Sequence, residues 1–280
     1  MIDHVQQIFD LPKVKKTFVA KKSVYQESNL SRKGIKCISD NVGRIYFIST
    51  IDEGFGVPSY VTEELDYSSI EFIWVELKNN EYKNAAKILQ QCIPKPTVIV
   101  LDYEDEIKIS TALKRKSAVS GDKVIIEEYY LSHLMDMNYL SEGEKEFLSS
   151  IKLRNLNYTN LYKMYLELCD KIFLSGLLDV IDFYPANISD IKLIKNKVYS
   201  IEERKDALSK IQGEYSRTGS FAHRMQLHIE IVKIKREIKR ITEELKGVCG
   251  YGKAGYEIKE SDLRKYSQVK GTVPGDSNGG

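Results

Sequence analysis

Apolar residues recur at alternating steps of four and three along residues 221–246, FAHRMQLHIEIVKIKREIKRITEELK. This average spacing of 3.5 residues is that of a coiled-coil seam, so the pattern predicts a helix that packs against a partner helix. The seam covers fewer than four heptads, so docking within its own domain and self-association both remain open. Ile229 and Val232 are apolar but lie outside the seam, which indicates a second contact surface. The predicted partner-docking residues are Leu227, Ile231, Ile234, Ile238, Ile241 and Leu245.

The first half of the chain has the pattern of β-strands. RIYFIST (44–50) and IEFIWVELK (70–78) are dense in β-branched and aromatic residues, as strands are. The continuous apolar run TVIVLDY (97–103) is typical of a strand that is covered on both faces. EIKISTALKRK (106–116) alternates and predicts a half-exposed strand, and VIIEEYYL (124–131) predicts one more.

Helical periodicity separates these strands. NNEYKNAAKILQQCI (79–93) predicts a helix capped by Asn79 or Asn80, and residues 29–42 predict a short helix before the first strand. The order of helix, strands, helix and strands predicts an α/β (α+β) fold. We therefore expect an N-terminal domain with a mixed sheet that ends near residue 135.

Beyond residue 135 the pattern becomes helical. Ser141 and Glu144 have the spacing of a capping box, and Asn157 or Thr159 precedes a second amphipathic helix. A long helix is expected from about Ile201, with a possible interruption near residues 218–219 and an end at Gly247. The predicted organisation is an α/β domain with a basic N-terminal arm (1–135), a helical region (136–200), a long amphipathic basic helix (201–247) and a flexible tail (248–280).

The charge of the chain is almost balanced, at +2 for 280 residues, so an argument for nucleic-acid binding has to rest on local clusters. One cluster is a lysine-rich arm before residue 37, and the other places cations on one side of the seam, with acids mainly on the other. Such runs are solvated faces in most proteins, and they also neutralise phosphates along a nucleic-acid backbone. The candidate nucleic-acid-binding residues are Lys13, Lys15, Lys16, Lys21, Lys22, Arg224, Lys233, Lys235, Arg236, Lys239 and Arg240.

Glu76-Leu77-Lys78 at the end of a predicted strand is the Glu-x-Lys of many metal-dependent nucleases. The order of elements around it resembles the core of the PD-(D/E)XK nucleases. In that chemistry two carboxylates hold a divalent cation and the lysine helps to activate water. Asp66 or Asp52 would have to supply the second carboxylate, and neither follows a proline on a convincing strand. Strand ends commonly carry solvated Glu and Lys, so we assign no catalytic residue and keep Asp66, Glu76 and Lys78 as the nuclease alternative.

Other candidate chemistry is weak. The four cysteines are scattered over more than 200 residues without metal spacing, which favours a reducing cytoplasm over a disulfide framework. Gly247, Gly252 and Lys253 match a phosphate-loop pattern, but a helix precedes them and Ala254 carries no hydroxyl. The first residues carry acids and have no apolar core of signal-peptide length, so we expect no signal peptide, and no apolar run approaches the ~20 residues that span a membrane. We expect no metal, no cofactor and no membrane contact.

Several segments together resemble a bacterial family known only as a domain of unknown function. They are FDLPKVKKTFVAKKSVYQ, RIYFIST, IEFIWVELK, ILQQCIPKPTVIVLDYEDEIKISTALKRK, NLNYTNLYKMYLELCDKI and FAHRMQLHIEIVKIKREI, in this order across residues 9–245. The resemblance implies a companion of DNA methyltransferases and helicase-like subunits in restriction-modification or anti-phage defence clusters. We therefore expect a non-catalytic accessory subunit that docks on a partner enzyme, with DNA backbone as a second candidate ligand. The alternatives are the PD-(D/E)XK-type nuclease and a self-associating coiled-coil scaffold.

Overall fold

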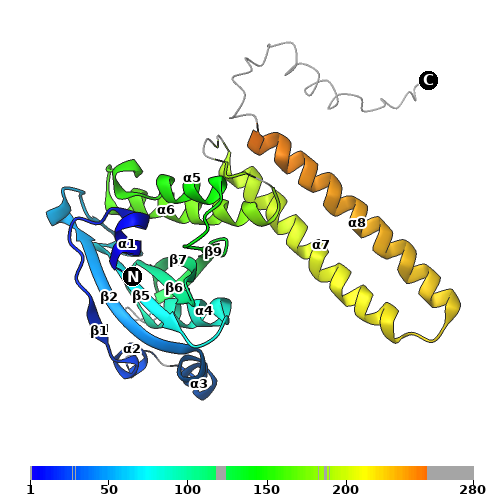
Figure 1. Ribbon diagram of the computed structural model, residues 1–280, viewed down its shortest axis with the longest axis horizontal. Helices are drawn as coiled ribbons and strands as arrows, with labels where there is room; N and C mark the ends of the chain where they lie inside the picture. Colours follow the sequence, from blue (N-terminus) through cyan, green and yellow to red (C-terminus); the bar gives the residue numbers. More distant parts are fainter. Residues whose placement is uncertain are drawn as a thin grey trace, which may run out of the picture. The chain divides into compact units, whose positions relative to one another are not determined.

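A computed structural model describes residues 2–26, 28, 30–117, 124–181, 183–185, 188 and 190–250 (Figure 1). The chain divides into two compact units, residues 1–186 and residues 187–280. The phosphate-loop residues Gly252 and Lys253 lie outside the described part.

A seven-stranded mixed sheet forms the centre of the first unit, in the order β1-β2-β5-β6-β7-β8 with β9 beside β7. The β5 and β6 strands are parallel, and α4 (Tyr82–Cys92) is the crossover that connects them. The other pairs are antiparallel. The α/β fold with a mixed sheet is confirmed. The strands are β1 (Thr17–Val19), β2 (Val42–Asp52), β5 (Ser69–Leu77), β6 (Thr97–Tyr103), β7 (Glu106–Lys116), β8 (Val124–Leu131) and β9 (Met135–Asp136), while β3 (Tyr60–Val61) and β4 (Asp66–Tyr67) form a separate pair.

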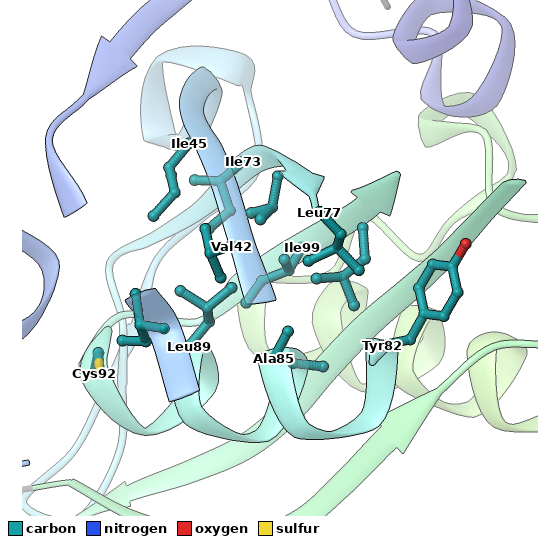
Figure 2. Packing of buried hydrophobic residues seen from close by; sticks show 13 residues of the cluster. Val42, Ile45, Ile73, Leu77, Tyr82, Ala85, Leu89, Cys92 and Ile99 are labelled. Atoms are coloured by element: carbon teal, nitrogen blue, oxygen red, sulfur yellow. The ribbon is translucent and has the colours of Figure 1, made fainter. Parts of the chain in front are cut away.

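Helices cover both faces of the sheet, because alternate side chains of the central strands are apolar on both sides. On one face Ile73 and Ile99 pack with Leu89 of α4 in a buried cluster that also contains a residue of α3 (Figure 2). On the other face Phe72 packs edge-on against Phe9 of α1, with ring centroids 5.1 Å apart. The remaining helices of this unit are α1 (Ile2–Phe9), α2 (Lys21–Gln26), α3 (Arg32–Asn41), α5 (Glu142–Ser150) and α6 (Leu161–Ser175), with the short 3-10 helices η1 (Glu53–Phe55), η2 (Leu153–Asn155) and η3 (Gly176–Asp179).

A buried tyrosine attaches α6 to the junction of β6 and β7. The hydroxyl of Tyr165 accepts the backbone N–H groups of Thr97 and Ala112, each at 3.2 Å, and lies 3.0 Å from the carbonyl oxygen of Thr97. The amide of Gln90, from α4, donates to the carbonyl of Thr97 at 3.1 Å. Two side chains from different helices thus satisfy backbone groups where the β6–β7 ladder ends.

This attachment changes the predicted domain boundary near residue 135. Helix α6 packs on β7 and β8, so the first compact unit continues to residue 186. Because α4 and α6 both cover β7, most of this strand is buried, and the predicted half-exposed strand is wrong. The capping box of Ser141 and Glu144 is confirmed. The caps predicted for two other helices are wrong, since Glu81 and Asn160 occupy those positions.

The second unit contains an antiparallel helical hairpin of α7 (Ile191–Arg217) and α8 (Phe221–Gly250) (Figure 1). The predicted interruption near residues 218–219 is therefore a full reversal of the chain. The first helix begins ten residues before the predicted start at Ile201. Helix α8 continues past Gly247, the predicted stop, because Cys249 extends the buried side of the helix. In the described part of the chain, no helix is both long and apolar enough to cross a membrane.

Candidate interaction surface on the C-terminal hairpin

The three nuclease candidates do not converge on one site. Asp66 lies before β5 and is paired with Lys95 at 3.8 Å, whereas Glu76 lies near the other end of that strand. The seven residue-to-residue steps of extended chain from Ser69 to Glu76 span about 23 Å. The Lys78 ammonium donates to the carbonyl of Ser39 at 2.7 Å and is held at the end of α3. These contacts fit the interpretation that Glu76 and Lys78 are solvated residues at the end of a strand rather than parts of a nuclease site.

The carboxylate that does lie beside Glu76 is Asp102, which the sequence did not indicate. The two residues are register partners on the parallel strands β5 and β6. Trp74 donates its indole N–H to Oδ2 of Asp102 at 3.2 Å, while Oδ1 is buried without a hydrogen-bond partner among the described residues. Burial raises the pKa of Asp102, and the nearby charges of Asp105 and Glu76 raise it further. Within the described chain, no three metal-ligating side chains come together here or elsewhere.

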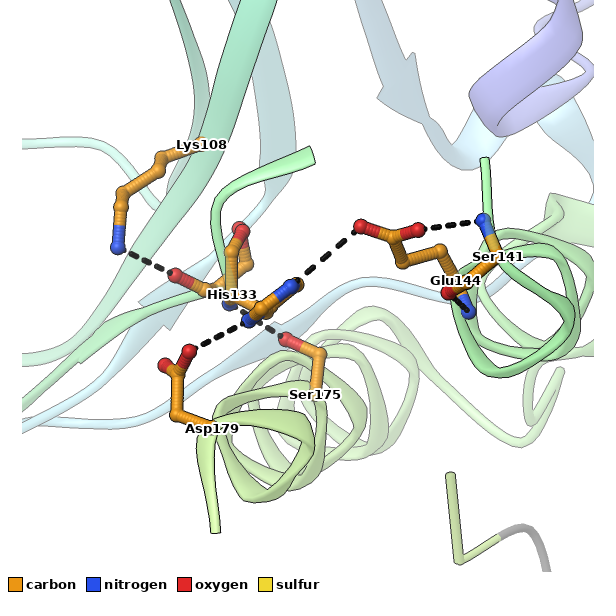
Figure 3. Close-up of polar contacts among 7 residues, drawn as sticks. Lys108, His133, Ser141, Glu144, Ser175 and Asp179 are labelled. Carbon is orange, nitrogen blue, oxygen red and sulfur yellow. Dashed lines mark hydrogen bonds and ion pairs between the residues drawn. The ribbon is translucent and has the colours of Figure 1, made fainter. Parts of the chain in front are cut away.

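A second polar group surrounds His133, between β8 and β9 (Figure 3). Its Nδ1 lies 2.8 Å from Asp179, and its Nε2 lies 3.4 Å from the buried Glu144 of α5. The backbone N–H of His133 donates to Ser175 Oγ, and that hydroxyl donates to Ile172. Ser175 is fully buried and already hydrogen-bonded, so it does not serve as a nucleophile. The network connects α5, α6 and η3 to the sheet, and we assign it a structural role.

The basic N-terminal arm is attached to the sheet rather than free. The β1 strand pairs with β2, and the backbone N–H of Lys15 donates to Ile48 at 2.9 Å. Lys21 donates to the carbonyl of Val42 at 2.8 Å, and burial lowers its pKa. Lys16 lies over the Tyr46 ring, 4.1 Å from its centroid. Lys13, Lys15, Lys16 and Lys22 are exposed, which fits the charged protection of a sheet edge.

The predicted coiled-coil seam packs against α7 of the same chain. Leu227, Ile231, Ile241 and Leu245 are buried, and Ile234 and Ile238 are half-buried. The facing helix contributes Ile194 and Ile201, both buried, with Leu208 seven residues further on. This spacing of seven residues in the sequence indicates that α7 is the helix that packs on the seam, and it was missed in the prediction from sequence. The seam residues therefore hold the hairpin together, and a further protein has to dock elsewhere.

Apolar residues outside the seam form a second row, which we call the outer face of α8. Phe221, Met225 and Ile229 are 79%, 48% and 65% exposed, and Val232 is half-buried. Their steps of four, four and three keep them on one side of the helix, opposite the seam. A shallow groove of about 540 Å³ runs along this side, lined by His228, Ile229, Val232, Lys233, Arg236 and Glu237.

The cations of α8 are spread more widely around the helix than the sequence predicted. Lys233 and Lys235 are two residues apart on a helix and point about 200° apart, so the cations do not share one side of the seam. The acids Glu237 and Glu244 pair with α7 through Arg204 and Lys197. Arg240 also pairs with Glu244, and Arg224 donates to the carbonyl of Thr218. Within the described residues no ion pair is formed by Lys233, Lys235, Arg236 and Lys239.

The site that these observations support is an interaction surface rather than a catalytic pocket. Three of the four residues in its apolar row are exposed, the neighbouring Lys233 and Arg236 form no ion pair within the described residues, and the helix that carries them is supported by a packed seam. Such exposed apolar residues with a charged rim are typical of protein interfaces.

A family model described as "Domain of unknown function (DUF4391)" matches residues 10–238. Comparison with curated proteins and comparison with solved structures found no match. The matched region contains the whole sheet, α7 and most of α8, including the outer face. The chain belongs to this family.

Proposed function

We propose that this protein is a non-catalytic accessory subunit of a bacterial DNA-processing complex that acts in anti-phage defence or restriction-modification. It docks on a partner enzyme through the outer face of α8. The observation that carries the proposal is the exposed apolar row on a helix whose seam is already filled by α7. Burial of such a row stabilises an interface by roughly 25 cal/mol per Å² of apolar surface.

The resemblance described above supplies the class of partner, a DNA methyltransferase or a helicase-like subunit. In this proposal the α/β unit is the assembly platform and the hairpin is the docking element. The cytoplasm is the proposed location, and the four free cysteines suit its reducing conditions.

The first test is co-purification of the tagged protein with the products of neighbouring genes, at low and high salt and after nuclease treatment. A stoichiometric complex that survives both treatments supports the proposal. Ile229→Asp places a charge on the outer face and should remove the partner. Leu193→Asp is the control, because Leu193 is an apolar residue of α7 that is also exposed, at 41% against 65% for Ile229. Equal loss of the partner in both variants, or in neither, would contradict the assignment of the surface.

Direct contact with DNA backbone is the second candidate function. It is favoured by the cations of α8 that form no ion pair within the described residues. Each phosphate contact releases counterions, so the affinity would fall steeply with salt. Duplex binding with a salt slope that decreases when Lys235 and Lys239 become Gln supports this candidate. Loss of the protein partner on nuclease treatment would show that DNA connects the two proteins.

The nuclease alternative is tested by Mg²⁺-dependent cleavage of plasmid DNA. The expected result is no cleavage by the wild type, because Asp66 and Glu76 lie at opposite ends of β5. Cleavage that Glu76→Ala abolishes would overturn the non-catalytic assignment. Self-association is tested by light scattering of wild type and Ile229→Asp, since the seam positions Ile234 and Ile238 face α7.

A further inference from the structure

We infer that the partner contributes an acidic amphipathic helix, which lies along the outer face of α8 as a third helix beside the hairpin. This inference rests on the proposed function and names the chemistry of the segment that the docking surface binds. It follows from the spacing of the apolar row, the position of the unpaired cations and the groove between them.

The spacing of the exposed apolar residues matches a helix. Met225, Ile229 and Val232 repeat the steps of four and three that the seam shows on the opposite side. Helix packing places the side chains of one helix into the spaces between such residues of another. The groove beside Ile229 and Val232 provides those spaces. An extended peptide would instead require an unpaired strand edge, which a helix does not offer.

The charge of the partner helix follows from which cations lack a partner. Lys233 and Arg236 line the groove, and neither forms an ion pair within the described residues. The one acid of the groove, Glu237, is already bound to Arg204 at 3.0 Å. The groove therefore presents net positive charge beside apolar side chains. A helix with Glu or Asp beside its apolar residues complements both features.

Two other occupants fit the surface less well. DNA backbone would contact the cations but would leave Phe221, Met225 and Ile229 against a hydrophilic ligand. A second copy of this hairpin would cover the apolar row but would bring Lys233 and Arg236 close to the same cations of its twin. Repulsion between like charges opposes that arrangement.

The test uses two synthetic helical peptides of about three heptads, with Leu at every a and d position. One peptide carries Glu at the flanking e and g positions, and the other carries Lys there. Binding to the full-length protein is measured by fluorescence anisotropy. We expect the acidic peptide to bind at least about tenfold more tightly than the basic one. The double variant Lys233→Glu/Arg236→Glu should reverse this preference, and Ile229→Asp should weaken both peptides.

The matched control is Lys205→Glu/Lys210→Glu, which reverses two exposed cations of α7 and should leave the preference unchanged. Circular dichroism of each variant checks that the helices persist. The inference is overturned if the wild type binds neither peptide or binds both equally. It is equally overturned if the α7 control variant no longer prefers the acidic peptide. It is also overturned if duplex DNA displaces the acidic peptide, or if light scattering shows a dimer that Ile229→Asp dissociates.

These outcomes separate the inference from the proposed function. If a partner co-purifies and Ile229→Asp removes it, but the wild type does not bind the acidic peptide, the proposed docking function stands and the acidic helix is rejected. If the acidic peptide binds specifically but no enzyme co-purifies, the outer face of α8 still binds acidic helices, and the accessory role in a DNA-processing complex is rejected.

Discussion

Arg204 donates its Nε–H to Oε2 of Glu237 at 3.0 Å, across the two helices of the C-terminal hairpin. Lys197 pairs with Glu244 in the same way at 2.7 Å, seven residues along each helix in opposite directions. The two pairs share one antiparallel register. They also connect two acids of α8 to α7, whereas Lys233 and Arg236 of α8 form no ion pair within the described residues.

The Arg204–Glu237 pair is expected to contribute modestly to stability, because both side chains are about one-third exposed. A double-mutant cycle with Arg204→Gln and Glu237→Gln should give a coupling free energy of about 0.2–1 kcal/mol. Denaturant titration at low and high salt measures it, and the coupling should shrink with salt. A coupling of zero at low salt would show that the pair does not set the register of the hairpin.

The same substitution should destabilise the hairpin at one isoleucine of α8 and have almost no effect at another. Ile231→Asp places a charge in the buried seam and should reduce the helicity of the hairpin and its unfolding free energy by several kcal/mol. Ile229→Asp should leave both nearly unchanged, since Ile229 is 65% exposed. Circular dichroism and hydrogen exchange of the α8 amides measure the difference. Equal destabilisation by the two variants would mean that the outer face is packed rather than free.

Tyr165→Phe should destabilise the first unit more than the loss of one ordinary hydrogen bond. The hydroxyl satisfies the N–H groups of Thr97 and Ala112, and phenylalanine would leave both buried and unpaired. We expect a loss of roughly 2–3 kcal/mol in the free energy of unfolding, measured by denaturant titration. Tyr139→Phe is the control, because Tyr139 is 84% exposed and should change stability by less than about 0.5 kcal/mol.

Lys114 should give the first unit a distinctive pH dependence. Its ammonium is buried and donates to the carbonyls of Ile93 and Lys95 at 2.7 and 3.0 Å. Burial lowers its pKa from the ordinary 10.5 to about 7, and the nearby Glu71 opposes this shift. Above pH 7 the folded protein therefore releases a proton that the unfolded chain retains. The free energy of unfolding should rise with pH, by about 1–2 kcal/mol between pH 7 and 8.5.

Lys114→Met is the variant that isolates this effect, because methionine keeps most of the volume and cannot titrate. It should lose the rise with pH, in addition to a constant loss from the unpaired carbonyls. The comparison has to stay below pH 9, since burial also raises the pKa of Cys249, to about 11, and that shift lowers stability once the unfolded thiol ionises. Parallel pH profiles of wild type and variant would show that Lys114 keeps its proton throughout.

The strands and the crossover helix were predictable from the sequence, because each has a local signal. IEFIWVELK and TVIVLDY have the β-branched and apolar runs of buried strands, and both are strands in the structure. The capping box at Ser141 is equally local. The half-exposed strand over 106–116 was wrong because its burial depends on α6, whose Tyr165 lies 53 residues beyond Ala112. No local pattern contains that information.

The candidate site shows the same division. The sequence alone determined a helix with two apolar sides. The spacings of four residues from Leu227 to Ile231 and of three residues from Ile229 to Val232 can be read directly from it. Only the tertiary structure decided which side is free: α7 folds back over the seam, and Arg204 of α7 pairs with Glu237. Periodicity specifies that a surface must be covered, because apolar side chains avoid water, but which element covers it depends on where the chain reverses.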